Sequence, residues 1–235
     1  MRVSLVTGAT RGIGAAITAE LRRLDHQVIG LARHRPSDWE GEFIECDVLD
    51  ENSLEEACRR IEELSTLWCL VNNAGVGHAD AIGEINLADM RRVFMANVFA
   101  PALLTKAAVG RMTDGGRILN ICSTAGLGKE ERSSYGSSKA ALASLTRTWA
   151  LELAHTGITV NAISPGPIET ELFRSRNPVG STGEAQQLKQ IPVKHFGKPA
   201  EVGTLAATIL GENLSYLTGQ VIYLDGGLSA GKTSI

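Results

Sequence analysis

Cysteine is scarce and scattered in this sequence of 235 residues. The four cysteines form no C-x-x-C pair, and no histidine-rich segment accompanies them: Cys46, Cys58, Cys69 and Cys122. Disulfide frameworks and zinc sites group these residues at short spacings. We therefore expect no disulfide and no metal site, and we interpret the four residues as buried thiols of a protein in a reducing cytoplasm.

Long apolar runs and an excess of one charge are also missing. No uninterrupted apolar stretch approaches the ~20 residues of a membrane helix, and the run ending at Val6 is too short for a signal-peptide core. Lys plus Arg is 23 and Asp plus Glu is 26, a net charge of −3. This balance predicts neither a nucleic-acid partner nor a membrane partner.

The rest of the composition is that of an ordinary globular protein, with 43% apolar and 21% charged residues. Short strand-like runs alternate with longer runs of helical periodicity. We predict strands over 3–6, 27–31, 42–46, 67–71, 117–121, 159–163 and 220–224. We predict helices over 13–24, 53–64, 88–109, 135–153 and 199–210. Pro101 should kink the third helix. The alternation predicts an α/β fold, a doubly wound parallel sheet of about seven strands with helices on both faces.

No linker divides the chain, so we predict one domain over 1–235. Residues 174–198 are polar and weakly patterned, which is typical of a lid or binding loop, and we predict a substrate lid there. We expect the five histidines at the surface or in loops: His26, His34, His78, His155 and His195.

A glycine-rich turn lies between the first strand and the first helix and runs Gly8, Ala9, Thr10, Arg11, Gly12, Ile13, Gly14. Glycine lets backbone amides approach a pyrophosphate, and a helix N-terminus offers it unpaired donors. The spacing G-x-x-x-G-x-G differs from the common G-x-G-x-x-G. A purely structural turn is the alternative, but the flanking strand and helix favour a dinucleotide site.

A second glycine motif, 226–233, matches the phosphate-loop pattern G-x-x-x-x-G-K-[ST] and ends in Lys232 and Thr233. A phosphate loop works by opening a helix whose N-terminus faces the phosphates. Only Ser234 and Ile235 follow in this sequence, so we expect no such helix. We reject a phosphate-loop hydrolase and predict a flexible tail over 228–235.

Several further motifs occur in a specific order. They are Asp47, Asn72-Asn73-Ala74-Gly75, Asn97, Ser123, Tyr135-x-x-x-Lys139, Pro165-Gly166, and a closing segment from Leu217-Thr218-Gly219 to Asp225-Gly226-Gly227. With the glycine-rich turn, they make the sequence resemble the short-chain dehydrogenase/reductase family over almost its whole length. The general look is closest to 3-oxoacyl-carrier-protein reductase-like members. The resemblance implies a Rossmann fold and an oxidoreductase that moves hydride between nicotinamide and a small-molecule or acyl-thioester carbonyl.

Four residues form the catalytic set that this resemblance implies. Tyr135 and Lys139 are four apart and share a helix face. A phenol ionises near pH ~10 in water, and a nearby ammonium stabilises its phenolate, so the pair suits proton transfer. The resemblance implies that Lys139 also holds the nicotinamide ribose, that Ser123 bonds the substrate oxygen and that Asn97 anchors a relay water. The Ser123–Tyr135 interval is slightly shorter than usual, and its loop is unusually charged, which bears on the substrate.

The resemblance also assigns cofactor contacts. It places the glycine-rich turn at the pyrophosphate, Asp47 and the Val48 backbone at the adenine, and Tyr135 and Lys139 at the nicotinamide end. The remaining contacts line the adenine ribose or follow the Pro-Gly turn near the carboxamide: Asn73, Ala74, Gly75, Pro165, Gly166, Ile168 and Thr170.

The end of the second strand predicts the choice of cofactor. In this fold a carboxylate there binds the ribose 2′-hydroxyl of NAD, whereas a basic group accommodates the 2′-phosphate of NADP. Here the strand ends in Ala32-Arg33. Arg11 resembles the second basic residue of NADP-preferring members. We predict NADP(H); the alternative is that both arginines are solvated surface charges.

Two interpretations of the function stay open. The first is the enzyme, and the second is a non-catalytic NADP-binding regulator on the same fold. A regulator would lack the tyrosine, lysine or serine, and all three are present. The family commonly forms tetramers through two long helices and the C-terminal strand, so the resemblance implies a homotetramer. The substrate itself is not named by the sequence, because the pocket loops vary freely on the scaffold.

Overall fold

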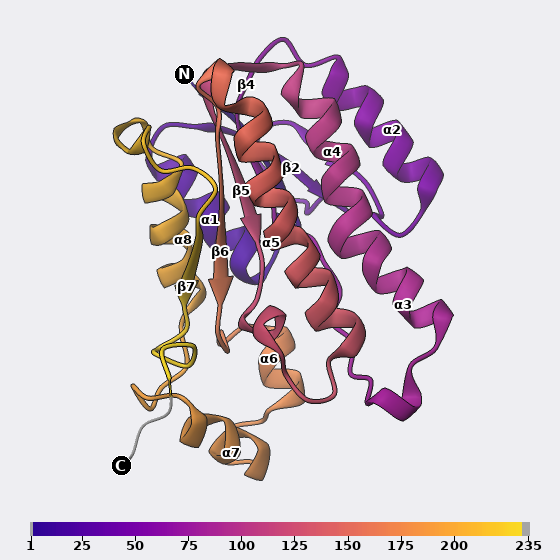
Figure 1. The fold of residues 1–235 in the computed structure, drawn as a ribbon. Coiled ribbons are helices and arrows are strands. Elements are labelled where there is room, and N and C mark those ends of the chain that lie inside the picture. The colour runs from indigo at the N-terminus through magenta and orange to yellow at the C-terminus, as the bar shows by residue number, and fades with distance from the viewer. Residues whose placement is uncertain (1, 232–235) are drawn as a thin grey trace.

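The computed structural model describes residues 2–231 and forms a single sheet with helices on both faces (Figure 1). All neighbouring strands pair in parallel, in the order β3-β2-β1-β4-β5-β6-β7. The strands are β1 (Val3–Thr7), β2 (Gln27–Ala32), β3 (Phe43–Glu45), β4 (Leu67–Asn72), β5 (Met112–Ile121), β6 (Thr159–Pro165) and β7 (Val221–Leu224). The chain starts in the middle of the sheet, winds to one edge and then to the other. The predicted doubly wound α/β class is confirmed.

Two helical layers bury the two faces of the sheet (Figure 1). One layer contains α2 (Glu51–Glu62), α4 (Ala100–Val109) and α5 (Ser133–Leu153), and the other contains α1 (Gly12–Arg23) and α8 (Pro199–Ile209). Strand residues alternate between them: Leu70 packs in the first core and Val71 in the second, both with no exposed surface. This period-2 alternation places the apolar strands between both layers.

The long apolar helix predicted over 88–109 is interrupted. It consists of α3 (Leu87–Phe94), a π-helical turn over Met95–Phe99, and α4. The geometry therefore changes before Pro101, which sits in the first turn of α4, where a proline is well tolerated. The predicted kink at Pro101 stays a prediction, with this irregular turn directly before it. By length and composition the run 87–109 could cross a membrane. Half of its most apolar stretch is buried inside the protein, however, as in a core helix.

The segment predicted as a lid contains more structure than its weak pattern indicated. It holds the end of α6 (Glu171–Arg176) and all of α7 (Thr182–Gln190). The side chains of Thr170 and Ser181 accept hydrogen bonds from backbone amides of the first turns, which explains where these short helices begin. Figure 1 shows both helices beyond the carboxyl ends of the strands.

His26 lies in the loop between α1 and β2, as the expectation allowed, but it is buried, and its ring hydrogen-bonds the Ser4 hydroxyl at 2.7 Å. At the other end of the chain, the Ala230 amide donates to the Gly227 carbonyl in a turn. Lys232 and Thr233 of the rejected phosphate-loop motif lie outside the described residues.

The two helices of the second layer touch through a glycine. A Cβ on Gly203 of α8 would lie 2.8 Å from the Ala16 carbonyl oxygen of α1 and 3.0 Å from its carbon. We predict that Gly203→Ala lowers the free energy of unfolding by about 1–3 kcal/mol, because backbone atoms cannot move aside as a side chain can. Chemical denaturation measures this.

Gly110→Ala is the matched control for that variant. Gly110 has an ordinary helical φ of −67° at the end of α4. Within the described part of the chain no atom lies within 4 Å of its added Cβ. This control should be neutral or slightly stabilising, and an equal loss in both variants would contradict the close-packing argument.

Candidate active site

The glycine-rich turn is attached to the end of β4 by one hydroxyl. Thr7 Oγ1 accepts hydrogen bonds from the backbone amides of Asn73 and Ala74, both at 2.9 Å, and donates to the Val71 carbonyl at 3.2 Å. The Asn73 side-chain amide donates back to the Thr7 carbonyl at 2.8 Å. The turn and the Asn-Asn-Ala-Gly segment therefore form one rigid floor at the carboxyl edge of the sheet.

The turn has the shape of an anion cradle. Gly8 and Gly12 have left-handed φ values of +64° and +54°. A Cβ on Gly14 would collide with the Gly8 carbonyl oxygen and lie 2.5 Å from the Asn73 side-chain nitrogen. Arg11 takes the N-cap position of α1, and among the described residues no side chain caps it and no acidic residue lies in the first turn. The helix N-terminus can therefore receive a phosphate, and the predicted dinucleotide fits here.

The segment after the Pro-Gly turn reaches this cradle at Gly12. Thr170 Cγ2 lies 3.2 Å from the position of a Gly12 Cβ. Its hydroxyl accepts from the Phe173 amide at 3.1 Å and so starts α6. Ile168, 6% exposed, is fixed by bridging to Gly197. The structure thus brings Thr170 next to the turn and uses its hydroxyl as a helix cap, while its contact with the nicotinamide carboxamide stays a prediction.

The far end of the cradle lies beside β2 and β3. The Gly8 amide donates to the Leu31 carbonyl at 2.7 Å, which places the turn next to Ala32 and Arg33. Arg33 is exposed and, within residues 2–231, has no carboxylate at ion-pair distance. Arg35 is engaged, since its guanidinium donates to the Trp39 and Gly41 carbonyls.

Asp47 lies at the same edge, directly after β3. One of its carboxylate oxygens accepts from the Leu49 amide at 3.0 Å, and its own amide donates to Ser53 Oγ. The side chain is thus held in a tight turn with one oxygen in use, and Val48 beside it is half-buried. The contact of Asp47 with an adenine amine stays a prediction.

Asn97 is the centre of the predicted catalytic group. It belongs to the π-helical turn and has no exposed surface. Its Oδ1 accepts from the Val76 amide at 2.9 Å, and its Nδ2 donates to the Val76 carbonyl and to Ser138 Oγ, both at 3.0 Å. Ser138 in turn donates to the Tyr135 carbonyl at 2.7 Å. The amide therefore ties the loop after β4 to the first turns of α5.

Lys139 and Tyr135 approach each other at this node. Lys139 is 5% exposed, and its ammonium donates to the Ile121 carbonyl at 2.7 Å while lying 6.0 Å from the centre of the Tyr135 ring. The Cβ position of Gly75 is 2.7 Å from Asn97 Oδ1 and 3.5 Å from the lysine nitrogen, so a side chain there would fill the space between them.

Ser123 follows β5 on the same edge and starts a short 3-10 turn. Its hydroxyl oxygen accepts from the Ala125 amide at 3.2 Å, which leaves its proton free to point elsewhere. The preceding Cys122 is not a competing nucleophile, because burial raises the pKa of its thiol to about 11. Sequence reasoning did not assign roles to Thr7 or Ser138. Only their positions beside a motif residue could have pointed to them.

The comparisons with known proteins agree with this geometry. A family model described as enoyl-(acyl carrier protein) reductase matches residues 8–229. The 3-oxoacyl-[acyl-carrier-protein] reductase FabG of Aquifex aeolicus is 35% identical over 244 residues, covering 97% of each chain. Glucose 1-dehydrogenase 2 of Bacillus subtilis is 33% identical over 246 residues, covering 97% of this chain and 95% of the relative. The chain belongs to the short-chain dehydrogenase/reductase family.

Solved structures of similar proteins superpose closely. A short-chain dehydrogenase/reductase from Serratia marcescens has a TM-score of 0.88 at 32% identity, with 97% of this chain and 98% of the other covered. A blue fluorescent protein from a metagenomic library, solved with NADPH, has a TM-score of 0.87 at 31% identity over the same shares. The protein is therefore a dehydrogenase/reductase that acts on CH–OH and C=O groups, and its family uses NAD(P)H.

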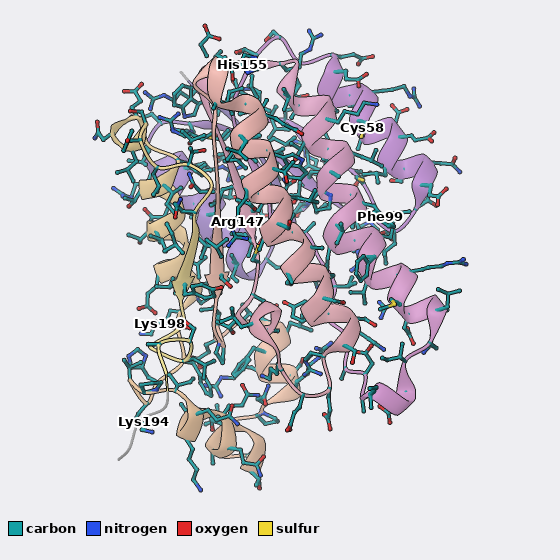
Figure 2. The ribbon with its side chains drawn as sticks, in the orientation of Figure 1. Cys58, Phe99, Arg147, His155, Lys194 and Lys198 are labelled. Atoms are coloured by element: carbon teal, nitrogen blue, oxygen red, sulfur yellow. The ribbon has the colours of Figure 1, made fainter. Side chains whose placement is uncertain are left out.

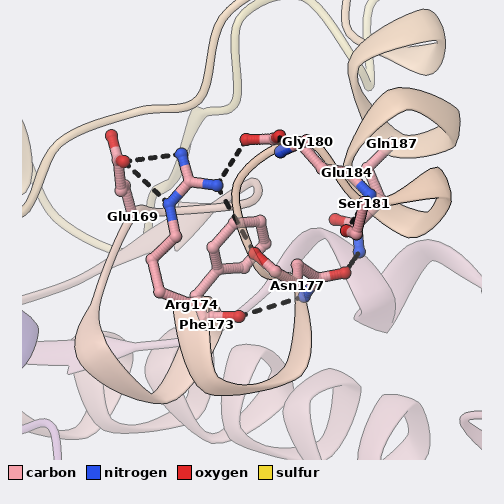
Figure 3. Close-up of polar contacts among 8 residues, drawn as sticks. All are labelled: Glu169, Phe173, Arg174, Asn177, Gly180, Ser181, Glu184 and Gln187. Carbon is pink, nitrogen blue, oxygen red and sulfur yellow. Dashed lines mark hydrogen bonds and ion pairs between the residues drawn. The ribbon is translucent and has the colours of Figure 1, made fainter.

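An ion network joins α6 and α7 beside this site (Figure 3). The Arg174 guanidinium donates to Glu169 at 2.6 and 2.8 Å and to Glu184 of α7. Glu184 also accepts from the Gly180 amide at 2.6 Å. The hydrogen bond from Arg174 has the larger effect and the one from the Gly180 amide the smaller, and both hold the pKa of Glu184 below its ordinary value. Its charge therefore helps to hold the segment at neutral pH, and this contribution is lost as the pH falls through the pKa of the folded carboxyl.

We predict that Glu184→Gln loosens the segment from residue 174 to residue 190. The variant keeps the size of the side chain but loses the charge that binds Arg174, so backbone amides over 177–188 should exchange faster with deuterium at neutral pH. Glu171→Gln is the control, because Glu171 is exposed on α6 and takes no part in the network. Equal exchange in wild type and both variants would refute the role of Glu184.

Proposed function

We propose that this protein is an NADP(H)-dependent reductase of small carbonyl compounds, with Tyr135, Lys139, Ser123 and Asn97 as its catalytic group. The observation that carries the proposal is the node around Asn97. It attaches the loop after β4 to α5 and leaves the Tyr135 ring and the Lys139 ammonium at one edge of the sheet. That edge also holds the glycine-rich cradle, as the ligand sites of doubly wound sheets do.

The roles of the side chains follow from their chemistry. A bound nicotinamide would supply or accept the hydride. The Tyr135 phenol donates a proton to the substrate oxygen during reduction and takes it back during oxidation. The Ser123 hydroxyl donates a second hydrogen bond to the same oxygen and fixes its place. Lys139 keeps donors beyond the one bound to Ile121, and its charge favours the phenolate. Asn97 Oδ1 has a second lone pair for a water that returns the proton.

The first test is the removal of the proton donor. Tyr135→Phe should retain NADPH affinity and lower kcat by about 10²–10⁴-fold, because general acid–base catalysis is worth that much. Tyr216→Phe is the control, since Tyr216 is fully exposed. Steady-state kinetics and fluorescence titration of NADPH measure both effects. A Tyr135→Phe enzyme with wild-type kcat would exclude Tyr135 as the acid.

The choice of NADP(H) is supported by charge at the end of β2. Ala32 offers no carboxylate to repel a 2′-phosphate, and Arg33 is exposed beside the cradle without an ion-pair partner in the described chain. Its paired N–H donors match a phosphate. Arg11 is exposed at the start of α1 and can approach the same group. Arg35 is bound to backbone carbonyls and does not compete for this role.

We predict that Arg33→Ala weakens NADPH binding and leaves NADH binding unchanged. A charged hydrogen bond of this kind corresponds to roughly ten- to a hundredfold in affinity. Arg23→Ala, at the last turn of α1, should change neither. Titration of both cofactors against all three proteins decides the matter: an equal loss for NADPH and NADH would show that Arg33 does not read the 2′-phosphate.

The substrate class that we favour is a 3-oxoacyl thioester or a related ketone. The FabG relative supports a thioester and the glucose dehydrogenase relative supports a sugar, so the two must be compared directly. The test is a panel of acetoacetyl-coenzyme A, ethyl acetoacetate and D-glucose, each assayed with both cofactors at 340 nm. Tight NADPH binding without turnover of any compound would favour the alternative, a non-catalytic NADP-binding regulator.

We further propose a cytoplasmic homotetramer. The four cysteines are free thiols, which suits a reducing compartment. Three large apolar side chains are exposed on the π-helical turn, α4 and α5. Phe99, labelled in Figure 2, is 50% exposed, Leu103 of α4 is 43% exposed and Leu151 of α5 is 81% exposed. These apolar residues give another copy a surface to cover. Analytical ultracentrifugation of the purified protein tests the assembly.

A further inference from the structure

A buried carboxylate lies beside the catalytic group without a role in the proposed chemistry. Asp80, in the loop after β4, is 2% exposed. Its two oxygens accept from the Ser134 amide at 3.2 and 3.0 Å, and one of them also accepts from the Ser134 hydroxyl. Within residues 2–231 no cation lies at ion-pair distance from it. A buried charge is costly unless its hydrogen bonds are made, so the Ser134 contacts must hold it.

The contact between Asp80 and Ser134 caps the N-terminus of α5. Arg132 takes the N-cap position of α5, and its side chain makes no capping hydrogen bond. Asp80 supplies the missing acceptor from a loop 54 residues earlier in the sequence. A carboxylate at this end is also favoured by the dipole of the 21-residue helix. The next residue after Ser134 is Tyr135.

The backbone strengthens the same attachment. The Asp80 amide donates to the Glu131 carbonyl at 3.0 Å, and Asp80 forms an isolated parallel bridge with Arg132. The other end of this loop, at Val76, is held by Asn97, which also binds Ser138. The segment from Val76 to Asp80 is thus tied to α5 on both sides of the catalytic tyrosine.

We propose that Asp80 is a positioning residue for Tyr135. By fixing the first turn of α5 to the loop after β4, it holds the phenol at the angle and depth that proton transfer requires. The inference rests on the proposed role of Tyr135. Because Asp80 contacts α5 and not the glycine-rich cradle, its loss should lower kcat by a larger factor than it weakens NADPH binding.

The test compares Asp80→Ala with Asp80→Asn, which retains an acceptor for the Ser134 amide. The panel substrate with the highest kcat is used, and kcat is divided by the number of NADPH sites found by titration, so that misfolded protein does not count. Asp80→Ala should lose about 10- to 100-fold in kcat per site, the effect of a misplaced catalytic group. Asp80→Asn should recover most of it. In the unliganded proteins, amides 133–139 should exchange faster in the alanine variant alone.

The result that overturns the proposal is an unchanged kcat per NADPH site in Asp80→Ala, or a loss that falls on NADPH affinity instead. If that variant does not fold, Ser134→Ala carries the test: it removes only the hydroxyl donor and should lower kcat by about fivefold, the worth of one hydrogen bond. An unchanged kcat there would equally overturn it. Tyr135→Phe distinguishes a failure of the proposed function from a failure of the proposed role of Asp80. If Tyr135→Phe is active, the proposed function fails; if it is inactive while Asp80→Ala has full kcat, only the role of Asp80 fails.

Discussion

The carboxamide of Asn97 is the contact on which the rest of this site depends. It is fully buried, and its hydrogen bonds join three separate parts of the chain: the π-helical turn, the loop at Val76 and the first turns of α5 at Ser138. Leaving such a group unpaired would cost about 1–3 kcal/mol for each lost partner, so the three parts hold one another in register. A π-helical turn at this point is understandable, since such turns often occur where a functional side chain must leave the regular helix path.

The cradle for the cofactor depends on a second constraint, which is space. Gly8 and Gly14 approach so closely that a methyl group on Gly14 cannot be accommodated against the Gly8 carbonyl. Thr7 and Asn73 then fasten the cradle to β4 with short hydrogen bonds. The amides at the start of α1 are thereby aimed before any phosphate arrives, and binding does not have to order them. The Asn97 node includes Gly75, where a Cβ would collide with Asn97 Oδ1 and lie in contact with the Lys139 ammonium.

In the proposed function, the substrate is selected by different elements from those that carry the chemistry. The catalytic group lies at the sheet edge, whereas the predicted lid consists of loops and the short helices α6 and α7, held by charged contacts such as those of Arg174. Segments of this kind change without disturbing the scaffold. This explains how relatives of similar identity carry names as different as an oxoacyl reductase and a glucose dehydrogenase.

Much of the fold could be predicted because its signals are local. The apolar runs and helical periodicities found all seven strands and the long helices, and the glycine spacing marked the turn that now forms the cradle. The features that the sequence did not indicate involve tertiary contacts. The burial of His26, within its loop, depends on Ser4 of β1. The helices at 171–190 carry little apolar pattern because they are held by ion pairs and caps.

The sequence by itself therefore determined the class of the fold, the family and the identity of the chemical groups, since these depend on periodicity, glycine positions and ordered motifs. Only the tertiary structure decided which groups meet. The contacts of Asn97 with Val76 and Ser138, the approach of Thr170 to Gly12, and the contact of Asp80 with Ser134 have no local signature. Each joins residues whose separation in sequence says nothing of their distance in space, and the strand edges of the folded sheet bring them together.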